Sequence, residues 1–187
     1  LIPYSSRAYP DKLTHIAQPP YAIFCKGAMP DARKSVGIVG ARMCSEYGRS
    51  IATKLGKLLA DKDVQVISGM ALGIDSASHA GALQGKGSTF AVLGCGCDVC
   101  YPKNARNLYE NIQSSGGGIL SEYPPGTEPM PYRFPERNRI ISALSDGVLI
   151  VEAREKSGSL ITAELALEQG KDIFVIPGRI GDTLSEG

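Results

Sequence analysis

The chain has 187 residues, an apolar fraction of 43% and a formal net charge of +1, so it is long enough to bury the core of one globular domain. The near-neutral charge excludes a globally basic nucleic-acid binder, and any nucleic-acid site must be a local patch. No apolar run reaches membrane-spanning length and no signal peptide is recognisable, while five cysteines in a chain of this size favour reduced thiols. We therefore expect a cytoplasmic protein without membrane association.

Residues 1–30 predict an irregular N-terminal lead-in, in which the short apolar run 22–25 fits an edge strand. Residues 31–187 predict the folded core. The chain begins with Leu1 and ends at Gly187, inside a polar loop that follows an apolar run. We expect a core domain taken from a longer polypeptide and truncated at its C-terminus.

From residue 36 onward, short apolar runs alternate with segments of helical periodicity. Strands are predicted at residues 36–39, 64–67, 90–93, 119–120, 148–151 and 173–176. Helices are predicted from residue 45 to about 59, and at about 75–83, 103–113, 137–144 and 159–169. The runs are continuously apolar, which is typical of strands that helices cover on both faces. The pattern predicts an α/β fold of the Rossmann-like, doubly wound type, with a mostly parallel sheet.

Two of these helices carry more detailed predictions. In the first, the apolar periodicity predicts one buried face, which consists of Tyr47, Ile51, Leu55, Leu58 and Leu59. The last helix is expected to be capped by Ser159 and closed by Gly170.

Ligands of open parallel sheets bind beyond the carboxyl ends of the strands. The segments at those ends, 40–42, 68–73, 94–96 and 152–159, are rich in small residues. Several lead directly into a helix, where free N–H groups and the helix dipole favour an anion. One such glycine marks an ordinary tight turn, whereas several at one edge favour a phosphate site.

Cations and one aromatic residue accompany these loops. Arg42 lies between a strand and a helix, where its guanidinium suits a bidentate phosphate contact. Segment 133–139 places arginines around Phe134, whose ring either stacks on a base or fills the core beside Pro135. Close arginines repel unless they meet an anion, which favours a phosphate site over a solvated helix turn.

Several enzyme and metal sites are disfavoured. The GxGxxG and GxxxxGK[ST] patterns are both missing, which argues against a dinucleotide dehydrogenase and a P-loop ATPase. His79 follows Asp75 by four residues, but without a GxSxG elbow it favours a structural hydrogen bond over general-base catalysis. Cys95, Cys97 and Cys100 lack a fourth metal ligand nearby in sequence. We expect no catalytic residue, no metal and no cofactor.

Eight short motifs then follow one another along the chain. They occupy residues 39–42, 68–75, 78–79, 101–102, 121–123, 134–141, 157–162 and 177–178. Together, from about Tyr9 to the end, they resemble the DprA/Smf family, the DNA-processing proteins of bacteria. Each motif is weak by itself, whereas eight in one order are highly specific.

The resemblance implies a protein that binds single-stranded DNA cooperatively and performs no chemistry on it. It also implies protection of incoming strands in natural transformation, loading of the RecA recombinase, and a homodimer of the full-length protein. By position in the motifs, the DNA-binding residues would be Gly40, Arg42, Ser68, Gly69, Ala71, Gly73, Phe134, Arg137, Asn138, Arg139, Ser157, Gly158, Ser159 and Thr162.

The sequence departs from the family pattern in places. Ala41 stands where the family commonly has Ser or Thr, so one hydroxyl contact is missing, and the three clustered cysteines are not a family feature. A helix that follows in the family, and that contributes to dimer and RecA contacts, is not included, which leaves self-association of this chain open.

Two other functions remain open. A nucleotide-binding or nucleotide-hydrolysing enzyme similar to the LOG family is the main alternative, although the PGGxGTxxE stretch of that family is missing from residues 152–159. A module that senses a mononucleotide is the third possibility, because one pocket can hold a mononucleotide instead of a strand.

Overall fold

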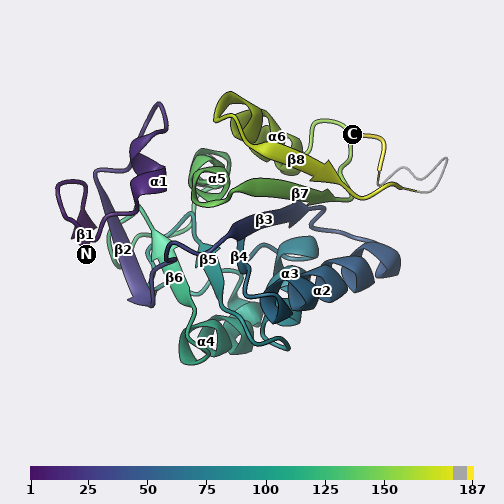
Figure 1. Ribbon diagram of the computed structural model, residues 1–187, viewed down its shortest axis with the longest axis horizontal. Coiled ribbons are helices and arrows are strands. Elements are labelled where there is room, and N and C mark those ends of the chain that lie inside the picture. Colours follow the sequence, from purple (N-terminus) through teal and green to yellow (C-terminus); the bar gives the residue numbers. More distant parts are fainter. Residues whose placement is uncertain (179–184) are drawn as a thin grey trace.

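One eight-stranded sheet with helices on both faces forms the described part of the computed structural model, residues 1–178 and 185–187 (Figure 1). The strands are β1 (Ile2–Pro3), β2 (Ala22–Gly27), β3 (Ser35–Gly40), β4 (Gln65–Ser68), β5 (Thr89–Val92), β6 (Gly118–Ser121), β7 (Gly147–Val151) and β8 (Asp172–Val175). The helices are α1 (Asp11–Thr14), α2 (Glu46–Asp61), α3 (Ile74–Ala82), the short 3-10 helix η1 (Lys103–Ala105), α4 (Arg106–Ser114), α5 (Arg133–Leu144) and α6 (Gly158–Glu168).

The strand order is β1-β2-β6-β5-β4-β3-β7-β8. The six strands from β6 to β8 in this order are parallel. At the β6 edge, β2 pairs antiparallel with β6, and β1 pairs antiparallel with β2. The predicted fold class is therefore confirmed, and each strand predicted from residue 36 onward lies within two residues of its expected position. The lead-in is more regular than expected, because it contains β1, α1 and β2, and β2 pairs on both sides. The division of the chain at residue 30 stays a prediction.

The helices form two layers. In Figure 1, α2, α3 and α4 lie on one face of the sheet, and α1, α5 and α6 lie on the other. The chain returns across the first face after β3, β4 and β5, and across the second after β6 and β7. Because β3 and β7 are neighbours whose helices leave toward opposite faces, a crevice opens at their carboxyl ends.

Helix α2 buries a different face from the one predicted. Its fully buried residues are small, namely Gly48, Ala52, Gly56 and Ala60. Tyr47 and Leu58 are largely exposed, contrary to the prediction, whereas Ile51, Leu55 and Leu59 are partly buried. The physical reason is close packing: a Cβ atom at Gly56 would collide with the Ser78 carbonyl of α3, and one at Gly81 with the Thr53 carbonyl of α2.

The predicted starts of two helices also need correction. Helix α5 starts at Arg133, four residues before its predicted start, because Pro135 in the first turn needs no hydrogen-bond acceptor for its ring nitrogen. Helix α6 has Ser157 at its N-cap, so the predicted cap by Ser159 is wrong. Gly170 closes this helix as expected, with φ of 67° and its N–H bonded to Leu167 O.

None of the described helices combines the length and the apolar character that crossing a membrane requires.

The contact between α2 and α3 gives the first prediction. Gly56→Ala should lower the free energy of unfolding by about 1–3 kcal/mol, because the new methyl group meets backbone rather than a movable side chain. Urea denaturation measures the change. Ser50→Ala, at an exposed position of the same helix, is the control and should change stability by less than about 0.5 kcal/mol. Equal stability of the two variants would contradict the close-packing explanation.

Candidate functional site

A pocket of about 240 Å³ lies at the carboxyl ends of β3 and β7. Its walls are the loops after β3 and β4, the first turns of α5 and the start of α6. Ten of the predicted residues line it: Gly40, Arg42, Ala71, Phe134, Arg137, Asn138, Ser157, Gly158, Ser159 and Thr162. A smaller hollow of about 70 Å³ adjoins the pocket. The two share four wall residues, Arg42, Ala71, Phe134 and Arg137. Gly69, another predicted residue, lines only the smaller hollow.

The loop after β3 is held by Glu152, which follows β7. The Glu152 carboxylate accepts hydrogen bonds from the backbone N–H of Ser45, at 2.8 Å, and from the Ser45 hydroxyl. The Ala41 N–H donates to the Glu152 carbonyl at 2.8 Å. Glu152 also has a positive φ of 56°, an uncommon conformation for a non-glycine residue. These bonds fix the position of the intervening Arg42.

Arg42 is exposed, and its guanidinium lies 5.5 Å from the centre of the Phe134 ring. In the described part of the chain no carboxylate forms an ion pair with it. Phe134 stacks in turn on Tyr101, with ring centres 5.3 Å apart and an interplanar angle of 26°. Arg42, Phe134 and Tyr101 therefore form a column of one cation and two rings at the mouth of the pocket, which we call the cation–aromatic column.

Phe134 is partly exposed and lines both hollows, so it is not a core filler. Tyr101 was not among the predicted site residues, although 41% of its surface is exposed and its ring lines the smaller hollow. The Tyr101-Pro102 motif was the one signal in the sequence that pointed to it.

The loop between β4 and α3 is held by two buried charges. Arg137 is 4% exposed, and its Nη1 donates to the carbonyls of Gly69, at 2.9 Å, and Val92. The Asp75 carboxylate accepts from the N–H groups of Gly69, at 3.1 Å, and Ala71, at 3.4 Å. Arg137 thus lines the pocket while it supports the loop, a structural role that the sequence did not indicate.

Burial shifts the pKa of both groups without removing their charges at neutral pH. Desolvation lowers the pKa of Arg137 to about 10, partly offset by the attraction of Asp75. Desolvation raises the pKa of the Asp75 carboxyl to about 6, against the lowering effect of Arg137 and of the two loop N–H groups. A fixed cation therefore underlies the pocket.

Arg139 lies outside the pocket, although Arg137 is only two residues away. Two positions on a helix differ by about 200° around its axis, so the two guanidinium groups leave α5 on opposite sides. Arg139 pairs with Glu122 at 2.6 Å, and its Nε donates to the Gln18 carbonyl at 3.0 Å. It joins α5 to β6 and to the N-terminal segment.

Ser68 and Gly73 also lie outside both hollows. The Ser68 hydroxyl is buried and donates to the Ile38 carbonyl at 2.6 Å, which joins β4 to β3. Gly73 has φ of 79°, and a Cβ atom there would collide with the Ala41 carbonyl. The geometry of both residues positions loops around the pocket.

The start of α6 presents free N–H groups to the pocket. No side chain caps this end of the helix, and the hydroxyls of Ser157 and Ser159 lie 2.8 Å apart. The Asn138 side-chain amide and the Thr162 hydroxyl both donate to the Gly158 carbonyl, each at 3.2 Å. Free N–H groups and the positive end of the helix dipole suit this position to an anion such as phosphate.

The other chemically notable residues are sequestered. Nδ1 of the fully buried His79 lies 2.7 Å from the Thr89 hydroxyl, and desolvation with the nearby Arg137 charge lowers its pKa to about 3. Burial raises the pKa of the Cys95 thiol to about 11 and that of the Cys97 and Cys100 thiols in the same direction. Within residues 1–178 and 185–187, no three His, Cys, Asp or Glu side chains converge into a metal-binding group.

The family model described as DNA recombination-mediator protein A matches residues 1–187. The chain belongs to this family. DNA processing protein DprA of Bacillus subtilis is 43% identical over 188 residues, which cover 100% of this chain and 63% of the relative. Protein Smf of Escherichia coli is also 43% identical over 188 residues, with 100% of this chain and 50% of that protein covered. The chain thus spans between half and two thirds of the length of these family members.

Solved structures show the same family fold. DNA processing protein A from Streptococcus pneumoniae superposes with a TM-score of 0.91 and 42% identity over 99% of this chain and 65% of that chain. The protein of the same name from Helicobacter pylori gives a TM-score of 0.81 and 34% identity over 92% of this chain and 79% of that chain. A molybdenum cofactor binding protein from Rippkaea orientalis, 20% identical with a TM-score of 0.55, shares the fold alone.

The buried charges give a prediction about stability and pH. Arg137→Met should lower the free energy of unfolding at pH 8 by about 3–5 kcal/mol, because it leaves the Asp75 carboxylate buried beside an uncharged group. The pKa of Asp75 in the folded variant should rise further above its unfolded value. Since the folded state then binds the proton more tightly, protonation stabilises it as pH falls, and the loss should be smaller at pH 5 than at pH 8.

Urea denaturation at pH 5 and pH 8 tests this prediction. Arg133→Met is the control, because Arg133 is half-exposed at the first position of the same helix. An equal loss at both pH values would show that Asp75 does not respond to the Arg137 charge.

Proposed function

We propose that this chain binds single-stranded DNA in the pocket between β3 and β7 and performs no chemistry on it. One observation carries the proposal: Arg42, exposed and without an ion pair among the described residues, lies over the Phe134 ring, which stacks on Tyr101, at the mouth of a pocket that α6 enters with free N–H groups. Cations and N–H donors bind phosphates, and aromatic rings stack on unpaired bases. Both kinds of group for binding a single strand therefore lie at one place.

The distribution of charge supports binding to the DNA backbone. The whole chain has a net charge of only +1, yet the pocket contains the Arg42 and Arg137 guanidinium groups and the start of a helix. Asp75 is the carboxylate among the pocket residues, and its Oδ2 accepts from the loop N–H groups. Because the backbone carries most of the affinity, binding should have little sequence preference and should weaken strongly with salt.

The relatives support the same function. The H. pylori structure is described as showing a single-stranded DNA binding mode of DNA processing protein A. Burial moves the pKa of His79 and of the Cys95 thiol away from neutral, which supports a structural rather than a catalytic role for these two groups.

The proposal extends to the activity of the whole protein. In it, the DNA-bound protein would act in the cytoplasm as a homodimer, protect incoming strands in natural transformation and help to load RecA. The family description as a recombination-mediator protein supports this role. Light scattering of the full-length protein tests the dimer. RecA filament formation on strands coated with single-strand-binding protein tests the loading, and an unchanged rate would contradict it.

Arg42→Ala should weaken binding of a labelled oligothymidylate and reduce the slope of log K against log salt by about 0.7, because one phosphate contact is lost. Fluorescence anisotropy at several salt concentrations measures both changes. Arg7→Ala, which removes an exposed arginine that lines neither hollow, is the control. An unchanged slope in the Arg42 variant would remove this residue from the site.

Phe134→Ala and Tyr101→Ala should each weaken binding by about 1–3 kcal/mol, because the outer face of Tyr101 can stack on a base and Phe134, between Tyr101 and Arg42, holds that ring in place. The salt slope should stay unchanged, because stacking releases no counterions. Phe134→Leu retains apolar bulk without a flat ring, and should weaken binding nearly as much as Phe134→Ala. Normal binding by the Leu variant would mean that Phe134 acts only as apolar filling.

Parallel titrations with duplex DNA and a mononucleotide distinguish the remaining alternatives. Binding of the single strand in preference to both supports the proposal. Saturable binding or turnover of the mononucleotide without strand binding would favour a LOG-like enzyme or a nucleotide-sensing module.

A further inference from the structure

A series of neighbouring hollows leads from the cation–aromatic column onto the outer surface of α2. The smaller hollow beside the pocket and the next one share Leu72. That next hollow and the one after it share Arg49 and Thr53. Successive hollows therefore follow one another from Arg42 to Lys57.

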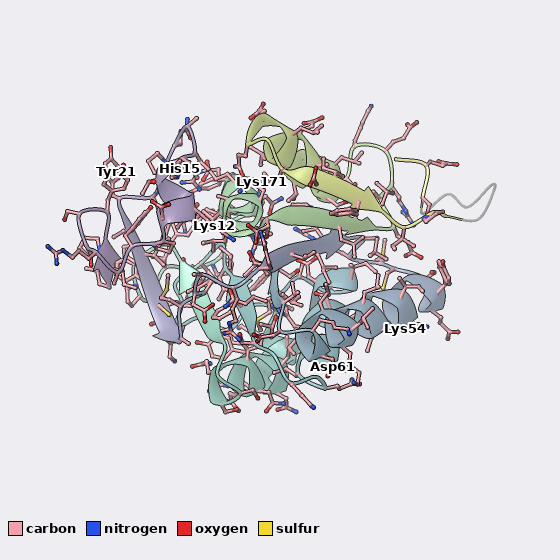
Figure 2. The ribbon with its side chains drawn as sticks, viewed as in Figure 1. Lys12, His15, Tyr21, Lys54, Asp61 and Lys171 are labelled. Atoms are coloured by element: carbon pink, nitrogen blue, oxygen red, sulfur yellow. The ribbon has the colours of Figure 1, made fainter. Side chains whose placement is uncertain are left out.

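We call the outer part of this path the α2 groove. It is defined by Arg49, Thr53, Lys54 and Lys57 of α2, with Asn104 and Asn107 on the opposite wall. Arg49, Thr53 and Lys57 recur at intervals of four and form a stripe along α2 beside the small residues that pack on α3. Lys54 lies three residues before Lys57, on the outer edge of that stripe. Figure 2 shows Lys54 on the outer side of α2.

The groove leads away from the pocket because α2 starts directly after the loop that carries Arg42. Arg49 lies in the first turn and Lys57 two turns further on, a rise of about 12 Å along the axis. A strand that leaves the pocket over Leu72 would therefore meet successive cations and not a single one.

The charges of the groove are suited to a polyanion. Arg49 and Lys54 are exposed and form no ion pair among the described residues, whereas Lys57 pairs with Asp61. Glu46 is the carboxylate that lines these outer hollows. The side-chain amides of Asn104 and Asn107 have no partner in the described part of the chain, and they supply further hydrogen-bond donors.

We propose that the α2 groove holds the sugar–phosphate backbone of the same single strand outside the pocket, so that the strand follows α2 away from the sheet edge. This inference rests on the proposed function. The pocket of about 240 Å³ is too small for more than a short part of a strand, and a strand that enters it must continue over the surface. The groove is the path on which cations and amide donors continue directly from Arg42.

The test compares two oligothymidylates, of about 2 and about 20 nucleotides, because only the longer one extends well beyond the pocket. The double variant Arg49→Ala/Lys54→Ala should bind the 20-mer about tenfold more weakly at low salt, with a salt slope reduced by about 1.4 for two lost phosphate contacts. Its affinity for the dinucleotide should change less than about twofold. Arg7→Ala/Lys62→Ala removes the same two side-chain types from exposed positions outside the groove. This control should bind both oligomers normally.

Chemical acetylation followed by mass spectrometry gives a second readout on the unaltered chain. The 20-mer should protect Lys54 from acetylation and the dinucleotide should not, while Lys62 should react equally in both complexes.

The proposed role of the α2 groove is contradicted if the double variant binds the 20-mer with unchanged affinity and salt slope. It is also contradicted if the double variant binds both oligomers more weakly by the same factor. Equal protection of Lys54 by duplex DNA would assign the groove to a different ligand. Wild-type binding to neither oligomer would contradict the proposed function itself, and the groove with it. Normal wild-type binding with an unaffected variant contradicts the groove alone.

Discussion

Strands β3 and β7 lie side by side in parallel, and the chain leaves them toward opposite faces of the sheet. No crossover helix can cover the carboxyl ends of both strands at once, so a crevice remains there as a consequence of the topology. A Cβ atom at Gly40 would collide with the Val151 carbonyl, so a glycine is required where the two strands end together. The pocket, the loop that carries Arg42 and the start of α6 all depend on this arrangement.

The crevice is made rigid by charges that are themselves buried. Arg137 and Asp75 hold opposite sides of the short loop after β4, one through its carbonyl and the other through its N–H groups. Taking such charges out of water is unfavourable. Their presence therefore fits a site in which the exact position of the loop after β4 matters more than the last increment of stability.

A net charge near zero is compatible with a phosphate-binding surface here, because cations without an ion pair among the described residues lie together along one path. Among the described residues, five basic side chains form ion pairs away from the pocket, as Arg139 does with Glu122 and Lys12 with Asp146. Arg42, Arg49 and Lys54 have no ion pair among the described residues, and the series of hollows runs past all three. A local excess of cations along one path can thus guide a strand without a globally basic protein.

The amino-acid pattern was enough to predict the class of fold and to point to the sheet edge where the pocket lies. Short, continuously apolar and β-branched runs such as 148–151 favour strands covered on both faces, and small residues directly after them predict close backbone approach. Both properties are local, so a short window of sequence contains them. The Arg42 loop and the start of α6 were found in this way.

Only the tertiary structure decided which side chains meet in the pocket. Arg137 and Arg139 belong to one motif, but the start of α5 at Arg133 directs the first toward the pocket and the second toward Glu122. The column of Arg42, Tyr101 and Phe134 joins three segments that strand order alone brings together. Helix phase and strand order depend on packing across the whole sheet, and local periodicity does not contain that information.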